Sequence, residues 1–268
     1  MVLAAVTQMT SSPAIAQNAK VAVSLIQRAA KAGAKAVFLP EATDFISPPD
    51  RVASLTYSQE NKDFVDAMTK AASESKVWVS VGVHEPADEA QKNKDAQAGS
   101  NTQRCWNTQL IINDAGLIKQ RYRKTHLFDV DTGDFKAKES NTTIPGLTLE
   151  PPIQTPLGKV GALICYDMRF AEPALRMRRQ GADILTYPSA FAVRTGAAHW
   201  SILLQARAIE TQSWVIAAAQ VGQHPDTNRH SWGHALVVDP WGTIVAQCPD
   251  TKPHKPTFAL ADVVSMRV

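Results

Sequence analysis

Three residues of types that catalyse acyl transfer stand directly after stretches that are typical of β-strands. Cys165 follows the apolar run V-G-A-L-I, Glu41 follows A-V-F-L-P, and Lys124 closes the segment R-Y-R-K. Cysteine-dependent hydrolysis requires a thiolate, a group that accepts the thiol proton, and a donor that stabilises an oxyanion. A charge just beyond a buried strand is costly to desolvate unless another group pairs with it. The joint occurrence of these residues at three strand ends therefore indicates one catalytic site.

Each residue also has an ordinary structural interpretation. Free cysteine is among the most buried residue types, so Cys165 could be a core side chain, and Glu41 and Lys124 could be solvated charges. Histidine could also activate Cys165, so a Cys–His hydrolase is an alternative at this point. The candidate histidines are His84, His126, His199, His224, His230, His234 and His254.

A metal site is the next alternative, because His230 and His234 form an H-x3-H pattern. Asn228, Ser231 and Gly233 around them indicate a loop rather than a ligand-bearing helix, and no third ligand follows at a suitable spacing. We therefore expect no metal ion.

The composition excludes several classes of protein. The 268 residues are 44% hydrophobic and 20% charged, with a formal net charge of +3 and no long basic run. These values give no electrostatic reason to expect nucleic acid or a membrane surface as a partner. No apolar segment approaches 18 residues, and A-I-A (14–16) lacks the preceding basic residue of a signal peptide.

Cysteine usage indicates the cellular compartment. The three cysteines are odd in number, widely spaced and free of any C-x-x-C pattern, which argues against a disulfide framework and a structural zinc site. We expect a soluble intracellular protein of the cytoplasm, with mitochondria as a second location. The cysteines are Cys105, Cys165 and Cys248.

Strand and helix patterns alternate along the chain. Apolar periodicity predicts helices over 58–75, 173–180 and 199–211, strands over 77–83, 160–164, 184–187 and 214–219, and hairpins at N-D-A-G and D-P-W-G.

Two stretches of the sequence resemble each other. G-A-K-A-V-F-L-P-E-A (33–42) aligns without gaps on G-A-D-I-L-T-Y-P-S-A (181–190). This similarity suggests an internally duplicated α/β sandwich that forms one domain over residues 1–268. Because ligands of α/β sheets bind beyond the carboxyl ends of strands, Glu41 and Ser189 are expected to face the same space.

Several motifs, in this order and spacing, resemble the nitrilase (carbon–nitrogen hydrolase) superfamily, and the resemblance extends from the first strand to about residue 262. The motifs are L-P-E-A, Y-R-K-T-H-L-F-D, L-I-C-Y-D-M-R-F, L-T-Y-P-S-A-F, T-G-A-A-H-W, R-A-I-E-T-Q and W-G-H-A-L-V-V-D-P-W-G. The resemblance implies a four-layer αββα sandwich that dimerises, and catalysis without a metal or organic cofactor.

The resemblance also implies roles for individual residues. Cys165 would be the nucleophile, Glu41 the general base and Lys124 the residue that stabilises the tetrahedral intermediate. Glu139, in K-A-K-E-S, would position Lys124 or the attacking water, and the backbone N–H of Tyr166 would complete the oxyanion hole.

Within the superfamily, A-I-E-T-Q and V-V-D-P-W-G-T-I-V-A-Q-C look most like the deaminated glutathione amidase branch. The implied substrate is a small-molecule amide with a carboxylate. Arg169 is the candidate to bind that carboxylate, since Arg binds carboxylates bidentately; its alternative role is a structural ion pair with Asp167 or Glu172. Phe191 and Thr195 are expected to line the pocket.

Two alternatives to this function come from different classes. An ω-amidase would act on α-ketoglutaramate, and an interaction protein would keep the fold without activity. The presence of all four catalytic residue types argues against the second alternative.

The sequence departs from the family pattern at three places. R-F-A-E and T-G-A-A-H-W each lack a proline, which predicts less rigid turns near the pocket. The sequence also stops at Ser265–Val268, where relatives carry a basic arm that helps dimers, so dimerisation is less firmly implied.

Overall fold

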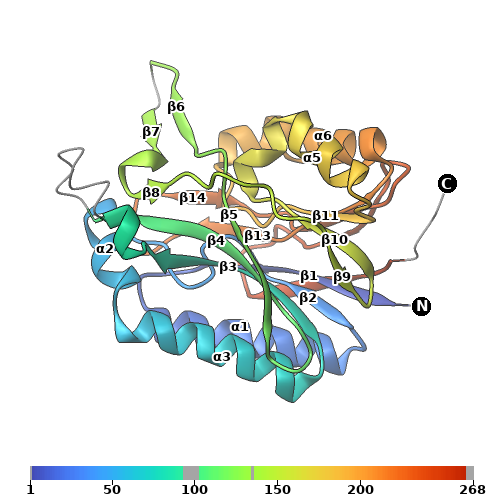
Figure 1. Cartoon of the computed structure of the whole chain (residues 1–268), viewed down its shortest axis with the longest axis horizontal. Helices are drawn as coiled ribbons and strands as arrows, with labels where there is room; N and C mark the ends of the chain where they lie inside the picture. Colours follow the sequence, from blue (N-terminus) through green and yellow to red (C-terminus); the bar gives the residue numbers. More distant parts are fainter. Residues whose placement is uncertain (1, 93–102, 134–135, 264–268) are drawn as a thin grey trace.

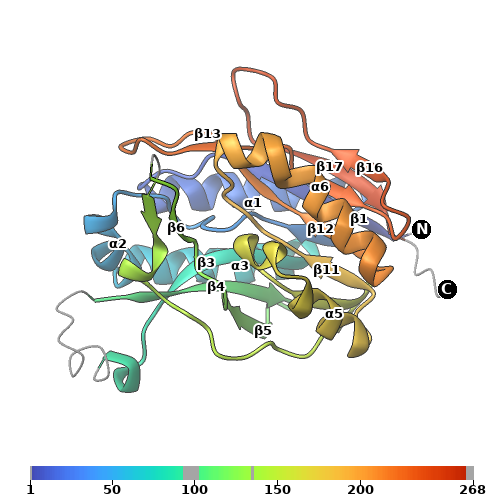
Figure 2. The same cartoon turned by 90° about the horizontal axis from the view of Figure 1, so that it is seen from above.

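Two β-sheets pack face to face, and helices cover the outer face of each sheet (Figures 1 and 2). The structure is a computed structural model, and it describes residues 2–92, 103–133 and 136–263. The helices α1 and α3 cover one sheet, and α5 and α6 cover the other. The predicted αββα sandwich is therefore confirmed.

The helices are α1 (Ile15–Lys31), α2 (Pro49–Thr56), α3 (Gln59–Ser75), α5 (Ala171–Arg179) and α6 (Val193–Thr211), with short 3₁₀ helices η1 (Glu139–Asn141) and η2 (Cys165–Arg169). The first sheet contains β1 (Leu3–Met9), β2 (Ala36–Phe38), β3 (Trp78–Pro86), β4 (Cys105–Ile112), β5 (Ile118–Arg123), β8 (Thr143–Ile144), β13 (Ala219–Gln223), β14 (His230–Trp232) and β17 (Thr257–Asp262). The second contains β9 (Ile153–Thr155), β10 (Gly158–Ala162), β11 (Ile184–Thr186), β12 (Trp214–Ala217), β15 (Leu236–Val238) and β16 (Ile244–Gln247), and β6 (Asp129–Asp131) pairs with β7 (Lys136–Lys138) outside both sheets.

The two halves of the sandwich share one strand arrangement. In the first sheet β1, β2 and β3 are parallel, and β3 continues antiparallel into the hairpin β4–β5. In the second sheet β10, β11 and β12 are parallel, and β12 continues antiparallel into the hairpin β15–β16. The similar segments 33–42 and 181–190 contain the equivalent central strands β2 and β11. The structure thus agrees with the predicted duplication.

A polar contact also joins the two sheets inside the sandwich. The side-chain amide of Gln109 on β4 donates to the hydroxyl of Ser80 on β3 at 2.7 Å and to that of Thr186 on β11 at 2.8 Å. All three side chains are buried, so their polar groups must pair within the protein. This bridge joins β3 and β4 of the first sheet to the end of β11 in the second sheet.

The helix α6 begins at Val193 rather than at the predicted residue 199. The prediction began too late because a glycine, here Gly196, usually suggests a loop. A Cβ atom at this position would lie 2.2 Å from Cγ of Trp232, so a glycine is needed where the helix packs against β14. Ala171 and Ala197 both lie in helices, not in the turns expected at the two missing prolines.

The predicted strand 214–219 is divided between the two sheets. β12 ends at Ala217 in the second sheet, and β13 starts at Ala219 in the first. A run of three alanines carries no signal for such a crossing. The helix α2 was not predicted, and residues 264–268, on which the expectation about a C-terminal arm depends, lie outside the described residues. No described helix is long and apolar enough to cross a membrane.

Candidate active site

The cysteine lies on a sharp turn between β10 and α5. Cys165 opens η2 with a φ of 43°, a left-handed backbone conformation that non-glycine residues seldom adopt. Its N–H donates to Pro188 O at 3.1 Å, just beyond β11. The buried carboxylate of Asp167 accepts from Ile164 N at 2.9 Å and from the Tyr122 hydroxyl at 2.8 Å. These contacts fix the strained turn and hold the Cys165 side chain at the strand end.

The backbone at Glu41 is also fixed, by close packing and by hydrogen bonds. Gly82 allows the approach, because a Cβ there would lie 2.6 Å from both Glu41 Cα and Pro40 O. Ala42 adopts a φ of 53°, and the side-chain amide of Gln220 donates to Glu41 O at 3.0 Å and to Ala42 O at 3.1 Å. The strand end is therefore anchored by a residue that the sequence analysis did not single out, Gln220.

The predicted lysine and glutamates form one buried cluster. Lys124 Nζ donates to Glu41 Oε1 at 2.9 Å and to Glu139 Oε2 at 2.9 Å. Asn107 Nδ2 donates to Oε1 of both glutamates, at 2.8 Å to Glu41 and 3.0 Å to Glu139. Phe128 N donates to Glu139 Oε2 at 2.7 Å. Asn107, which sequence reasoning missed, thus bridges the two carboxylates.

The charges of this cluster reinforce one another. Burial alone would raise the pKa of Glu41, but the charge and hydrogen bond of Lys124, the charge of Arg229 and the hydrogen bond of Asn107 lower that pKa to about 2. Burial alone would lower the pKa of Lys124, whereas Glu139 and Glu41 raise it well above its usual value. At neutral pH Glu41 is therefore a carboxylate and Lys124 an ammonium ion.

The thiol of Cys165 lies against this cluster. Burial and the neighbouring Glu41 charge raise the pKa of Cys165 to about 12, although Lys124 and the N–H of Ala190 act in the opposite direction. The resting site thus holds a neutral thiol beside a carboxylate. Described groups that act on the thiol are Glu41, Lys124 and the Ala190 N–H, and no histidine is among them. The contacts favour Glu41 over histidine as the proton acceptor.

The ends of the equivalent strands β2 and β11 meet at this point. Ala190 N donates to Glu41 Oε2 at 2.9 Å. The hydroxyl of the preceding Ser189 instead donates to Tyr187 O at 2.9 Å. The strand ends converge as predicted, but a backbone N–H rather than the Ser189 side chain contacts the glutamate.

Three of the four predicted substrate-side residues, Tyr166, Arg169 and Phe191, form an aromatic and cationic group, two members of which lie in η2 with Cys165. The Arg169 guanidinium lies 5.4 Å from the Tyr166 ring centroid and 5.6 Å from that of Phe191. Tyr166 is the second residue of η2, where a backbone N–H has no acceptor within the helix. Thr195 lies in the first turn of α6, and its hydroxyl donates to Ala192 O at 3.2 Å.

Arg169 is not engaged in the ion pairs that its alternative role required. The ion pairs of the described residues include none from Arg169 to Asp167 or Glu172, and its Nη2 lies 3.3 Å from His199 Nδ1. Asp167 is occupied instead by η2 and by the segment after β5. Arg169 is therefore a cation without a carboxylate partner in the described part of the chain.

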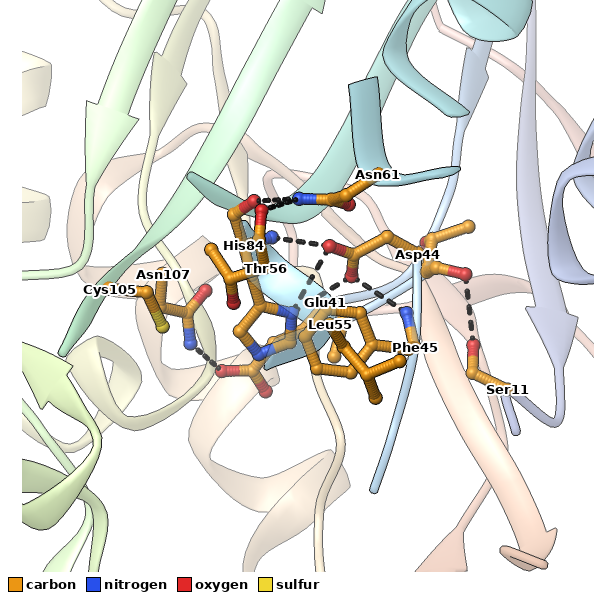
Figure 3. A network of polar contacts seen from close by, with 12 residues as sticks. Ser11, Glu41, Asp44, Phe45, Leu55, Thr56, Asn61, His84, Cys105 and Asn107 are labelled. Carbon is orange, nitrogen blue, oxygen red and sulfur yellow. Dashed lines mark hydrogen bonds and ion pairs between the residues drawn. The ribbon is translucent and has the colours of Figure 1, made fainter. Parts of the chain in front are cut away.

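A histidine–aspartate pair lies beside Glu41 (Figure 3). His84 is two residues after Gly82 on β3, so its side chain is on the strand face that packs on Glu41. Its Nδ1 lies 3.0 Å from Asp44 Oδ1, its backbone N donates to Asp44 Oδ2, and its ring stacks on Phe45. Burial would lower the pKa of His84, but Asp44, and more weakly the two glutamates of the site, raise it.

The predicted H-x3-H residues do not converge on a ligand position. His230 lies on β14 with its ring against His254, and His234 contacts the backbone carbonyl of Trp232. Residues 2–92, 103–133 and 136–263 contain no group of three or more His, Cys, Asp or Glu side chains placed to hold a metal ion.

Comparisons with known proteins agree with this geometry. A family model described as carbon-nitrogen hydrolase matches residues 3–265. The mouse deaminated glutathione amidase is 48% identical over 92% of this chain and 74% of its own length. The probable hydrolase nit2 of Schizosaccharomyces pombe is 45% identical over 98% of this chain and 92% of its own. The crystal structure of the C. elegans NitFhit protein has 39% identity and a TM-score of 0.86, covering 97% of this chain and 60% of that longer one.

The family model and these relatives cover nearly the whole chain, so the predicted family and branch are confirmed. The chain belongs to the carbon–nitrogen hydrolase family of the nitrilase superfamily, a family of hydrolases that act on C–N bonds, and resembles its deaminated glutathione amidase branch.

Proposed function

We propose that the protein is an amidase that hydrolyses deaminated glutathione to 2-oxoglutarate and cysteinylglycine through a thioester on Cys165. The observation that carries this proposal is the buried Lys124–Glu41 pair, whose two charges both act on the neighbouring Cys165 thiol. The substrate is supported by the relatives at 45–48% identity, several of which are named deaminated glutathione amidase.

Acylation begins with proton transfer from Cys165 to Glu41 while the sulfur attacks the amide carbonyl carbon. The pKa of about 12 for the thiol and about 2 for Glu41 disfavour a free thiolate, so proton transfer accompanies C–S bond formation. The Lys124 ammonium and the N–H of Tyr166 stabilise the oxyanion. The C–N bond then breaks, and protonated Glu41 gives its proton to the leaving amine.

Deacylation uses the same groups with water as the nucleophile. Glu41 removes a proton from the water, whose oxygen attacks the thioester carbonyl, and the sulfur leaves and regains a proton. Glu139 contacts Lys124 directly, with its Oε2 2.9 Å from Nζ, which supports a role in positioning the ammonium group. No metal ion or organic cofactor takes part in this proposed sequence.

The substrate's acyl group carries a carboxylate, and Arg169 is the group proposed to bind it. Its guanidinium is held against two aromatic rings and has no carboxylate partner among the described residues, so its donors are available to a ligand. Phe191 is buried beside it and contacts Trp200 with ring centroids 5.3 Å apart. Phe191 and Thr195 are proposed to form the pocket wall around the acyl chain.

The test is to compare kcat/KM of the purified protein on deaminated glutathione and α-ketoglutaramate. We expect deaminated glutathione to be preferred, and C165A to retain the fold but lose turnover. A preference for α-ketoglutaramate would identify an ω-amidase instead. A folded wild-type protein with no activity on either amide would favour an interaction protein without catalysis, and substantial activity of C165A would refute the thioester mechanism.

We also propose a homodimer, formed through an exposed apolar face on the outer side of α6. Ile202 and Ile209 are 66% and 55% exposed, and Trp241 in the β15–β16 turn is 86% exposed. Gln205 Nε2 donates to Gly242 O at 2.7 Å, so this turn packs on the helix and the apolar side chains lie on one surface. Light scattering should give a dimer mass for the wild type and a monomer mass for I202D/I209D.

A further inference from the structure

A second arginine lies at the active site, on the side of Glu41. Arg229 directly precedes β14, and its Nη2 donates to Ala190 O at 2.9 Å. The N–H of the same Ala190 donates to Glu41 Oε2 at 2.9 Å. One residue therefore separates the guanidinium group from the catalytic carboxylate, and the charge of Arg229 is among those that act on Glu41.

No contact with a carboxylate explains the position of Arg229. Among the described residues it forms no ion pair, and the nearby Asp226 pairs with Arg51 at 3.6 Å instead. Arg229 is exposed, and a guanidinium group has five N–H donors, of which the structure uses one. A cation at this place also makes Glu41 a weaker base, which is a cost to catalysis. An anionic ligand would account for the unused donors.

Arg169 and Arg229 approach neighbouring residues of the segment after β11. Arg169 lies over the Phe191 ring and comes from η2, the element that carries the nucleophile. Arg229 contacts Ala190, the residue that holds Glu41. In the proposed reaction the acyl group becomes attached to Cys165, and the leaving amine takes its proton from Glu41. The two arginines therefore correspond to the two sides of the scissile bond.

We infer that Arg229 binds a carboxylate on the leaving group, so that the site selects amides that carry a negative charge on both sides of the C–N bond. This inference rests on the proposed function and narrows its substrate class. Deaminated glutathione meets the requirement, because cysteinylglycine ends in a carboxylate at most ~7 Å of chain from the scissile nitrogen. α-Ketoglutaramate does not, because its leaving group is ammonia.

The test uses three amides that share the acyl group: deaminated glutathione, its glycine carboxamide analogue, and α-ketoglutaramate. Loss of a charge-assisted hydrogen bond should lower kcat/KM of R229Q on deaminated glutathione about 10- to 100-fold. On the two substrates with uncharged leaving groups there is no carboxylate contact to lose, and any effect of R229Q through Glu41 is common to all three amides. We therefore expect the loss on deaminated glutathione, measured relative to these two substrates, to be about 10- to 100-fold. R229K, which keeps the charge, should recover part of the loss.

R51Q is the matched control, since it removes an exposed guanidinium that pairs with Asp226 in the neighbouring loop, and it should leave all three rates unchanged. The wild type alone gives a second readout: it should prefer deaminated glutathione to the carboxamide by about 10-fold or more at low salt.

The possible failures are distinguishable. A wild-type protein that hydrolyses none of the three amides would overturn the proposed function and this inference together. A wild type that hydrolyses the acid and the carboxamide equally well, or an R229Q variant that loses the same factor on all three amides, would overturn the inference and leave the proposed function standing.

Discussion

Lys124 Nζ lies 2.9 Å from Glu41 Oε1, although the two residues are 83 positions apart in the chain and both side chains are buried. The ammonium group also contacts Glu139, so a single cation is shared by two carboxylates. This arrangement keeps Glu41 ionised and in one orientation before substrate arrives. Lys124 therefore holds the proposed base in place, in addition to its proposed role at the oxyanion.

Replacing Lys124 should impair both activity and stability. K124A removes the cation that compensates the buried Glu41 carboxylate and also pairs with the partly buried Glu139, so the free energy of unfolding should fall by about 3–5 kcal/mol. Loss of an oxyanion donor should also lower kcat about 100- to 1000-fold. Chemical denaturation and steady-state kinetics measure the two effects. K119A is the control, because Lys119 is an exposed lysine on β5, and it should change neither the free energy of unfolding nor kcat. A K124A variant of normal stability would contradict the proposed charge balance.

Asn107 should be required in its amide form, because its Nδ2 donates to both glutamates. N107A is expected to lower kcat/KM about 10-fold, the effect of losing a hydrogen bond to a charged group. N107D places a third carboxylate beside two others, and the pKa of such a carboxyl group is raised by like charges. The free energy of unfolding of N107D should therefore be only slightly below that of the wild type at pH 5, and the difference should grow as the pH rises to 8. Thermal unfolding at the two pH values tests this, and a pH-independent deficit would contradict it.

Gly82 should tolerate no side chain, because a Cβ would lie 2.6 Å from both Glu41 Cα and Pro40 O. G82A must therefore displace the backbone that carries Glu41, the proposed general base, and a small misplacement of a catalytic group can cost about 100-fold in rate. We expect kcat to fall by that order. A42G is the comparison: it relieves a φ of 53° one residue from Glu41 and should keep the fold stable. Full activity of G82A would show that the site can shift without loss.

The residues of the candidate site that lie just after strands could be singled out from the sequence, because each follows a stretch typical of a β-strand. Glu41, Lys124 and Cys165 stand where β2, β5 and β10 deliver them, and their chemistry limits the reactions available. Asn107 could not be found in the same way. It opens the polar run N-T-Q in the buried strand β4, where its residue type does not distinguish it from its neighbours, and its position is set by the register of β4 against β3.

The supporting residues were hidden for a similar physical reason. Gln220 reaches Glu41 only because the chain crosses from the second sheet to the first at Ala218, and no residue type marks that crossing. Arg229 lies in a polar loop that looks like an ordinary connection, and its contact with Ala190 arises only when β13 and β14 pair. Long-range backbone pairing, rather than local propensity, places these groups.

The pair of His84 and Asp44 predicts a pH dependence of stability. The pKa of His84 is raised in the folded protein, since Asp44 and the two glutamates of the site favour the charged ring over the effect of burial. Protonated His84 therefore stabilises the folded state fully below the unfolded pKa of about 6.5, and this contribution is lost as the pH rises through the folded pKa. The free-energy difference between wild type and H84Q should be on the order of 1 kcal/mol larger at pH 6 than at pH 9.

D44N provides the matched test of this pair, because it removes the carboxylate that contacts the backbone N and the ring Nδ1 of His84. In the D44N background, the H84Q substitution should no longer produce a pH-dependent difference, since the charged ring has lost its main partner. Urea denaturation of the four proteins at pH 6 and pH 9 completes the cycle. A wild type whose advantage over H84Q is the same at both pH values would show that the pair contributes through packing against Phe45 and not through charge.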